Sequence, residues 1–284
     1  MSAPATKLLS SIAPLAPRYD AWICDVWGVM HNGAAAFPGA VEACRRFREG
    51  GGTVLLLSNA PRPAPAVQAQ LDRFGVPPDA YDSILTSGDL TRQLVSERRD
   101  QRLFHLGPER DKPLFEGLDL RFTSAEEAEL LVCSGLYNDE VETPADYTGL
   151  LEPLARRGVP MICANPDLVV ERGSRIVYCA GSLAAEYERL GGSVIYAGKP
   201  YRPIYDLAFE RLEDLRGGPV ARERILAIGD GVKTDIRGAA NAGIDSVFIA
   251  SAIHVTGDLD AAAIEQLFKE CDRHPVAALP ALVW

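Results

Sequence analysis

The chain has 284 residues, of which 47% are hydrophobic, and its formal net charge is −10. This length predicts two domains or one domain with a large insertion. The acidic balance argues against sequence-independent binding to nucleic acid or to an anionic membrane surface. No run reaches the roughly 18 apolar residues of a membrane span, and the N-terminal residues do not form a secretory signal. We therefore expect a soluble cytoplasmic protein. Its six cysteines contain no C-x-x-C pair, and four of them lie in or beside apolar runs (Cys24, Cys133, Cys163 and Cys179), which indicates buried thiols rather than disulfides.

Apolar runs alternate with helical patterns along both outer parts of the chain, which is typical of a parallel sheet covered on both faces. In the first part we predict strands at 21–25, 53–57 and 83–86, and helices at 39–49, 65–74 and from 87 to about 98. In the last part we predict strands at 193–197, 225–228 and 247–250, and helices at 203–215 and 233–242.

The middle of the chain has strand signals of its own. They lie at 103–105, 130–133, 160–163 and 176–178, with helical patterns near 125–129 and 144–157. The sequence therefore predicts an α/β fold in which a Rossmann-like, doubly wound parallel-sheet core (1–99 and 193–284) carries an inserted α/β cap domain (100–192).

Four predicted strands each deliver a polar side chain to their carboxyl end, namely Asp25, Ser58, Lys199 and Asp230. In a parallel sheet these ends converge on one crevice, where ligands bind. A carboxylate there can attack phosphorus, and Mg²⁺ prefers one or two carboxylates together with phosphate oxygens. A hydroxyl and an ammonium group can bind the phosphoryl oxygens. Asp235, on the first turn of the next helix, could hold Lys199, Ser58 or a metal-bound water.

Each of these residues also has an ordinary interpretation. An aspartate at a strand end is more often a helix cap or a turn residue, and Ser58-Asn59 alone is a common turn. The four polar groups in this order, each after an apolar run, are much less expected by chance. The sequence thus favours a site for a phosphorylated ligand.

The segments D-V-W-G-V (25–29), L-L-L-S-N (55–59), G-K-P (198–200) and G-D-G-V-K-T-D (229–235) resemble the four motifs of the haloacid dehalogenase superfamily. The insertion between the second and third motifs resembles the cap of its class IIA branch, which includes sugar-phosphate, nitrophenyl-phosphate and pyridoxal-phosphate phosphatases. Ala164-Asn165-Pro166-Asp167 and Gly181-Ser182-Leu183 are similar to cap segments of that branch.

The resemblance implies a role for each matching residue. Asp25 would be the nucleophile and a magnesium ligand, with Asp230 and the Trp27 backbone carbonyl as further ligands and Asp235 supporting the metal site. Ser58, Asn59 and Lys199 would bind the phosphoryl group, with Lys199 also taking part in catalysis.

The sequence departs from the family pattern at Trp27. Hydrolases of the superfamily usually carry an aspartate there, which protonates the leaving group and activates water, and an indole does neither. Losing a general acid/base costs ~10²–10⁴ in rate. Two substitutes stay open: His31, six residues after the nucleophile, and Asp167 in the cap. His31 can also be a turn histidine, and Asp167 can stabilise its own turn.

These observations favour a Mg²⁺-dependent phosphohydrolase of a small phosphorylated metabolite, such as a sugar phosphate, that acts through an aspartyl-phosphate on Asp25. One alternative is a catalytically degenerate protein that binds a phosphorylated ligand or has a regulatory role. Another is a phosphotransferase or an enzyme for good leaving groups. A homo-oligomer is compatible with the sequence, which does not fix the oligomeric state.

Overall fold

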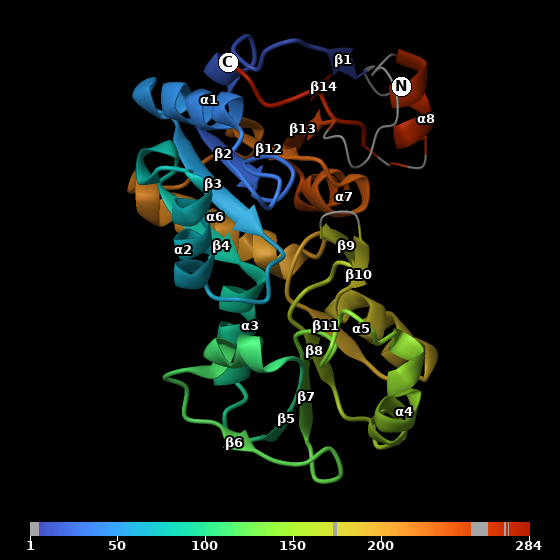
Figure 1. Cartoon of the computed structure of the whole chain (residues 1–284). Coiled ribbons are helices and arrows are strands. Elements are labelled where there is room, and N and C mark those ends of the chain that lie inside the picture. Colours follow the sequence, from blue (N-terminus) through green and yellow to red (C-terminus); the bar gives the residue numbers. More distant parts are fainter. Residues whose placement is uncertain (1–5, 173–174, 251–260, 270, 272) are drawn as a thin grey trace. The chain divides into compact units, whose positions relative to one another are not determined.

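The computed structural model describes residues 6–172, 175–250, 261–269, 271 and 273–284 (Figure 1). The chain divides into two compact units. The first draws its described residues from Met1–Ser58, Val67–Leu85 and Lys199–Trp284, and the second comprises Asn59–Ala66 and Thr86–Gly198. The second unit therefore includes two segments before residue 100, so the predicted boundaries at 100 and 192 stay a proposal.

The first unit is built on a seven-stranded sheet in the order β1-β14-β13-β12-β2-β3-β4. The strands are β1 (Lys7–Leu8), β2 (Ala21–Asp25), β3 (Thr53–Ser58), β4 (Ser83–Thr86), β12 (Ile225–Gly229), β13 (Asp245–Ile249) and β14 (Ala277–Leu279). In this order, each pair of neighbouring strands from β1 through β14, β13, β12 and β2 to β3 is parallel. Every residue of β2, β3 and β12 is buried, as expected of central strands covered on both faces.

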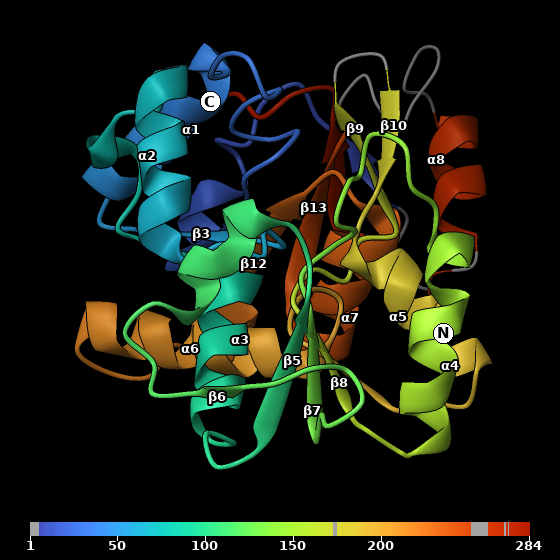
Figure 2. The same ribbon diagram turned by 60° about the horizontal axis from the view of Figure 1, so that its bottom comes forward.

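Helices cover both faces of this sheet. They are α1 (Pro38–Glu49), α2 (Ala64–Phe74), α6 (Arg202–Arg216), α7 (Arg237–Ala242) and α8 (Ala261–Phe268). α1 and α6 both contact β3, and Figure 2 shows them on opposite sides of it. The predicted doubly wound parallel core is thus confirmed.

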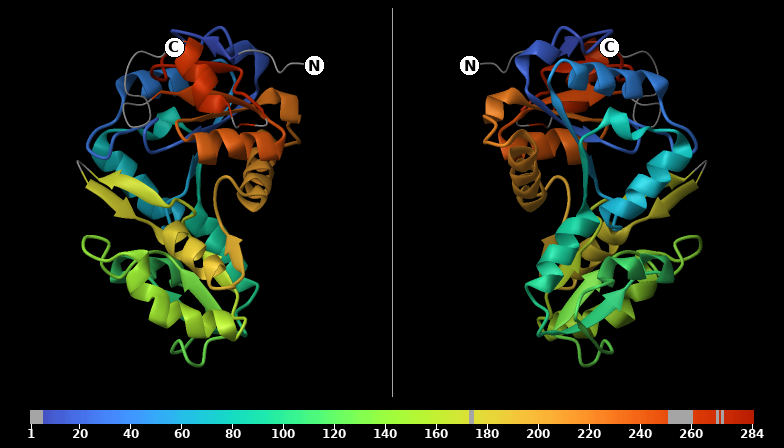
Figure 3. Two further views of the ribbon diagram at one scale, coloured as in Figure 1. Left: turned by 90° about the vertical axis from the view of Figure 1, so that its right-hand side faces the viewer. Right: turned by 90° about the vertical axis from the view of Figure 1, so that its left-hand side faces the viewer.

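The second unit has its own five-stranded parallel sheet in the order β11-β8-β7-β5-β6. Its strands are β5 (Arg102–Leu106), β6 (Arg121–Phe122), β7 (Leu130–Cys133), β8 (Met161–Cys163) and β11 (Val194–Tyr196). The helices α3 (Ser87–Ser96), α4 (Thr148–Arg156) and α5 (Ala180–Arg189) flank this sheet, with α3 on one side and α4 and α5 on the other (Figure 2). An antiparallel hairpin of β9 (Val169–Arg172) and β10 (Arg175–Tyr178), drawn in yellow in Figure 3, forms a separate ribbon.

Two predictions are wrong. The strand predicted at 193–197 in the last part of the chain is present as β11, but it pairs with β8 of the five-stranded sheet and not with the core strands, because a short apolar run does not specify its partner. The helix predicted near 125–129 is a turn. The helix α5 was missed because Gly181 lowers helix propensity. Only glycine fits at this position, because a Cβ there would collide with the Pro166 carbonyl oxygen.

The expectation about the cysteines is confirmed, because none of the six forms a disulfide and the four predicted to be buried thiols are all buried. Among the described residues, no helix is long and apolar enough to cross a membrane.

The buried ring of Trp22 on β2 stacks on Phe47 of α1 with ring centroids 3.9 Å apart, while its Nε1 has no hydrogen-bond partner. We expect Trp22→Ala to lower the free energy of unfolding by about 3–5 kcal/mol, because it leaves a large cavity. Trp22→Phe keeps an aromatic partner and loses no hydrogen bond, so its cost should be clearly smaller. Urea unfolding of both variants checks this, and equal costs would contradict it.

Candidate active site

The carboxyl ends of β2, β3 and β12 bring three predicted site residues to one edge of the sheet. Asp25 pairs with Leu57, the residue before Ser58. β12 lies in parallel register on the other side of β2 and ends at Gly229, the residue before Asp230. The register therefore brings the ends of these three strands to one edge, and convergence of the side chains is confirmed for Asp25 and Asp230, whose carboxylate oxygens lie within 4.8 Å of each other.

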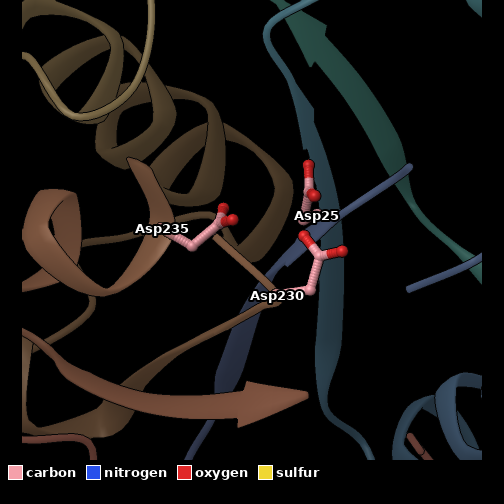
Figure 4. A group of neighbouring side chains, drawn as sticks. All are labelled: Asp25, Asp230 and Asp235. Atoms are coloured by element: carbon pink, nitrogen blue, oxygen red, sulfur yellow. The ribbon is translucent and has the colours of Figure 1, made fainter. Parts of the chain in front are cut away.

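Three carboxylates meet at this edge. Asp25, Asp230 and Asp235 each offer an oxygen, and these oxygens all lie within 4.8 Å of one another. Figure 4 shows the carboxylates of Asp25 and Asp230 beside each other at the strand ends, with that of Asp235 directed toward them. All three residues are buried. Hard oxygen donors at this spacing suit a small divalent cation.

Lys199 joins two of these carboxylates. Its Nζ lies 2.6 Å from Asp25 Oδ1 and 2.6 Å from Asp235 Oδ1, and its side chain is 4% exposed. The second oxygen of Asp235 accepts a hydrogen bond from the Gly231 N–H at 3.1 Å. Asp235 is thus held from both sides, and it holds Lys199 against the proposed nucleophile.

The charges in this cluster oppose one another. Burial and the Asp235 and Asp230 carboxylates raise the pKa of Asp25, and Lys199 offsets this in part. Burial lowers the pKa of Lys199, but the Asp235 and Asp25 carboxylates outweigh burial and raise it overall, so the ammonium stays charged. With all four groups ionised their net charge is −2, which one divalent cation would balance.

Two glycines make room for the carboxylates. Gly28 has φ +79°, and a Cβ there would collide with Asp230 Oδ2. A Cβ at Gly229 would collide with the Asp235 carboxylate. The sequence contained both glycines, but only the structure shows that they serve the acidic cluster.

Trp27, the residue that departs from the family pattern, belongs to a small flap after β2, which comprises residues 26–36. Its ring packs against Gly33, where a Cβ would lie 2.5 Å from Trp27 Cη2. Gly33 has φ +85°, a conformation that favours glycine. The ring also meets the edge of His31, with centroids 5.3 Å apart. The indole is thus fixed by its neighbours in the flap.

His31 is part of this packing. It is 2% exposed, its Nδ1 accepts a hydrogen bond from the Gly33 N–H at 2.9 Å, and its ring lies 4.8 Å from that of Phe74. Burial lowers the pKa of His31 to about 4. A neutral, buried imidazole with one nitrogen already engaged supports the turn interpretation of His31 and argues against its use as an acid or base near neutral pH.

Asn59, predicted to bind the phosphoryl group, has its side chain in hydrogen bonds within the second unit. Its Nδ2 donates to Asp167 Oδ1 at 2.8 Å, and its Oδ1 lies 3.4 Å from Ser87 Oγ. The Asp167 N–H in turn donates to Asn165 Oδ1 at 3.0 Å. Asp167, the second candidate to replace the missing acid, is therefore also part of a hydrogen-bonded turn.

The comparisons with known proteins agree with this architecture. The model of the haloacid dehalogenase-like hydrolases matches residues 22–121, and an HAD-hydrolase-like model matches residues 196–269. A hydrolase of the haloacid dehalogenase-like family from Brucella suis 1330, known from a crystal structure, has 49% sequence identity to this chain. The two structures match with a TM-score of 0.86, and the match covers 97% of this chain and 100% of the other.

The chain belongs to the haloacid dehalogenase-like hydrolase family.

Two curated relatives of this family member have named activities. Ribonucleotide monophosphatase NagD of Escherichia coli (strain K12) is 26% identical over 84% of this chain and 90% of its own length. The acid sugar phosphatase of Staphylococcus haemolyticus (strain JCSC1435) is 24% identical over 91% of this chain and 92% of its own length. The resemblance to the class IIA phosphatases of the haloacid dehalogenase superfamily is thus confirmed, and the chain is an enzyme of the hydrolase class.

The second unit of this hydrolase holds a mixed polar cavity of about 360 Å³ that sequence reasoning missed. Its lining includes Arg62, only four residues after Ser58, and the ion pair of Arg110 with Asp139. Asp111 also lines it and is 4% exposed, and burial raises its pKa. Arg110 and Asp111 are neighbours in the short 3-10 helix Glu109–Phe115, whereas Arg62 and Asp139 come from distant parts of the chain, so no single sequence motif indicates this cavity.

Removal of Lys199 tests the electrostatic centre. We expect Lys199→Met to lower the free energy of unfolding by about 3–5 kcal/mol at pH 7, because it leaves buried carboxylates without their shared cation. The neighbouring exposed Lys233→Met is the matched control, with a change within about 0.5 kcal/mol. Urea unfolding measures both, and equal stability of the two variants would contradict the central role of Lys199.

Proposed function

We propose that this protein is a Mg²⁺-dependent phosphohydrolase that acts on a small phosphorylated metabolite, a sugar phosphate or similar, through an aspartyl-phosphate on Asp25. One observation carries the proposal: a buried ammonium group, Lys199, is shared at 2.6 Å by Asp25 and Asp235 next to a third carboxylate. A nucleophile and a cation that can meet the phosphoryl oxygens are thereby adjacent. The named activities of the relatives, a ribonucleotide monophosphatase and an acid sugar phosphatase, support a phosphate ester as substrate.

In this mechanism a carboxylate oxygen of Asp25 attacks phosphorus. The new acyl-phosphate bond forms as the bond from phosphorus to the ester oxygen breaks, and the leaving oxygen takes a proton from solvent water. A second water then attacks phosphorus and gives up a proton to solvent, the acyl-phosphate bond breaks, and the Asp25 carboxylate is regenerated with release of inorganic phosphate. Lys199 and the Ser58 hydroxyl stabilise the charge on the transferring group throughout, which is the main contribution that a protein makes to phosphoryl transfer.

The donor set fits a magnesium ion. Asp25, Asp230 and the Trp27 backbone carbonyl would hold it, and Asp235 would support the site, since buried hard oxygens with an excess of negative charge are what this ion prefers. When bound, the ion neutralises charge on the phosphoryl oxygens.

A second candidate function rests on Trp27. The flap residues 26–36 contain no carboxylate, and His31 is buried and neutral. The flap therefore supplies no strong acid for the leaving group and no base for water. This favours esters with good leaving groups, and it favours a phosphoenzyme that lasts long enough to pass its phosphoryl group to an alcohol, as in a phosphotransferase.

The nucleophile is tested by Asp25→Asn. With an aryl phosphate and Mg²⁺, we expect the wild-type protein to show metal-dependent turnover and the variant to lose it by at least about a thousand-fold, because an amide cannot form the phosphoenzyme. Asp20→Asn, at a half-buried aspartate that pairs with Arg224 just before the same strand, is the control and should stay active. A wild-type rate no higher than that of Asp25→Asn on a broad panel of phosphate esters would refute the phosphohydrolase and favour a protein that only binds its ligand.

The role of Trp27 is tested by the time course of the same reaction. If water is poorly activated, release of the aryl alcohol should show a burst close to the enzyme concentration, followed by a slower steady state. Trp27→Asp should raise the steady-state rate, by up to ~10²–10⁴. Trp27→Phe should not, which separates the new carboxylate from loss of the indole. An unchanged rate in Trp27→Asp would mean that another group already activates the water.

A further inference from the structure

The boundary between the two units passes directly beside both proposed phosphate-binding side chains. The chain leaves the first unit after Ser58 and enters the second at Asn59, and it leaves the second at Gly198 and returns at Lys199. Neighbouring Cα atoms are about 3.8 Å apart. Whatever fixes Asn59 and Gly198 in the second unit therefore limits where Ser58 and Lys199 can lie.

Asn59 is fixed by Asp167. The Asn59 Nδ2 donates a hydrogen bond of 2.8 Å to Asp167 Oδ1, and Asn59 is 6% exposed. Asp167 is itself held by its backbone N–H, which donates to the buried Asn165 at 3.0 Å. This hydrogen bond is partly buried and its acceptor is a carboxylate, so it is among the stronger ones, and its loss takes one partner from the buried Asn59 amide.

Gly198 lies against the same side chain. A Cβ at Gly198 would be 2.5 Å from Asn59 Oδ1 and 2.8 Å from Pro166 Cδ, and it would collide with Ser87 Oγ. Its φ is outside the left-handed region, so space and not backbone conformation demands a glycine here. Asn59, Ser87, the 166–167 turn and Gly198 thus form one packed cluster, which we name the Asn59 clamp.

We propose that Asp167 is a positioning residue for the phosphoryl site. Through its hydrogen bond to Asn59 it holds both ends of the Asn59 clamp, and so it sets the spacing between Ser58 and Lys199. The inference rests on the proposed phosphohydrolase function. The family resemblance implied that Asn59 contacts the phosphoryl group. The proposal instead assigns the side-chain amide of Asn59 to positioning.

The test exchanges donor and acceptor across the hydrogen bond. Asp167→Ala removes the acceptor, and Asn59→Asp places two carboxylates face to face. Each should lower kcat for an aryl phosphate by about ten- to a hundred-fold, since small displacements of positioning groups have effects of this size. Each should also raise the inhibition constant of inorganic phosphate, because that anion occupies the phosphoryl site. The double variant Asn59→Asp/Asp167→Asn restores the bond in the opposite direction and should return to within about three-fold of the wild type.

Asp119→Ala is the control, since Asp119 is an exposed aspartate of the same unit. Urea unfolding identifies any variant that fails to fold, and if Asp167→Ala fails, the comparison of Asn59→Asp with the double variant decides. Wild-type kinetics in the single variants, or no recovery in the double variant, would overturn the clamp. An inactive wild-type protein would instead overturn the proposed function itself, so the two failures are distinguishable.

Discussion

The site depends on the two ion pairs that the buried ammonium group of Lys199 makes with Asp25 and Asp235. Three aspartates at one edge of a sheet repel one another when buried, and the protein tolerates them because Lys199 lies 2.6 Å from two of them. Because one lysine cannot neutralise three carboxylates, the four groups together still carry excess negative charge. The arrangement therefore offsets part of the repulsion among the carboxylates with a side chain of the protein itself and still favours a divalent cation, as the proposed metal-dependent phosphoryl site requires.

Backbone geometry makes this arrangement possible. Parallel register brings the ends of β2, β3 and β12 level, and glycines at positions 28 and 229 leave the space that the Asp230 and Asp235 carboxylates occupy. A side chain at either glycine would collide with a carboxylate rather than with a flexible surface group. The acidic cluster is thus a product of strand ends and missing Cβ atoms together.

Much of this was predictable from the sequence, because it depends on local patterns. Asp25 and Ser58 are the last residues of fully buried strands and Asp230 follows another, and a parallel sheet brings such residues to one edge. Features that depend on distant partners were not predictable. The run 194–196 resembles any core strand, yet it pairs with β8, and no local signal distinguishes the two sheets. Similarly, nothing in Ser58-Asn59 predicts that the amide bonds a residue 108 positions later.

Trp27 shows how far fold and chemistry can separate in this family. The backbone at this position needs only a carbonyl and a tight turn into Gly28, which any residue followed by glycine provides. The side chain is therefore free to change without loss of the fold, and here it packs on Gly33 and His31. In the proposed mechanism, formation of the aspartyl-phosphate uses Asp25, Lys199 and Ser58, and with a good leaving group it needs no general acid, whereas hydrolysis always needs an activated water. For such an ester, a tryptophan at position 27 slows mainly the second half of the proposed reaction, so the lifetime of the phosphoenzyme would distinguish a hydrolase from a phosphotransferase at this site.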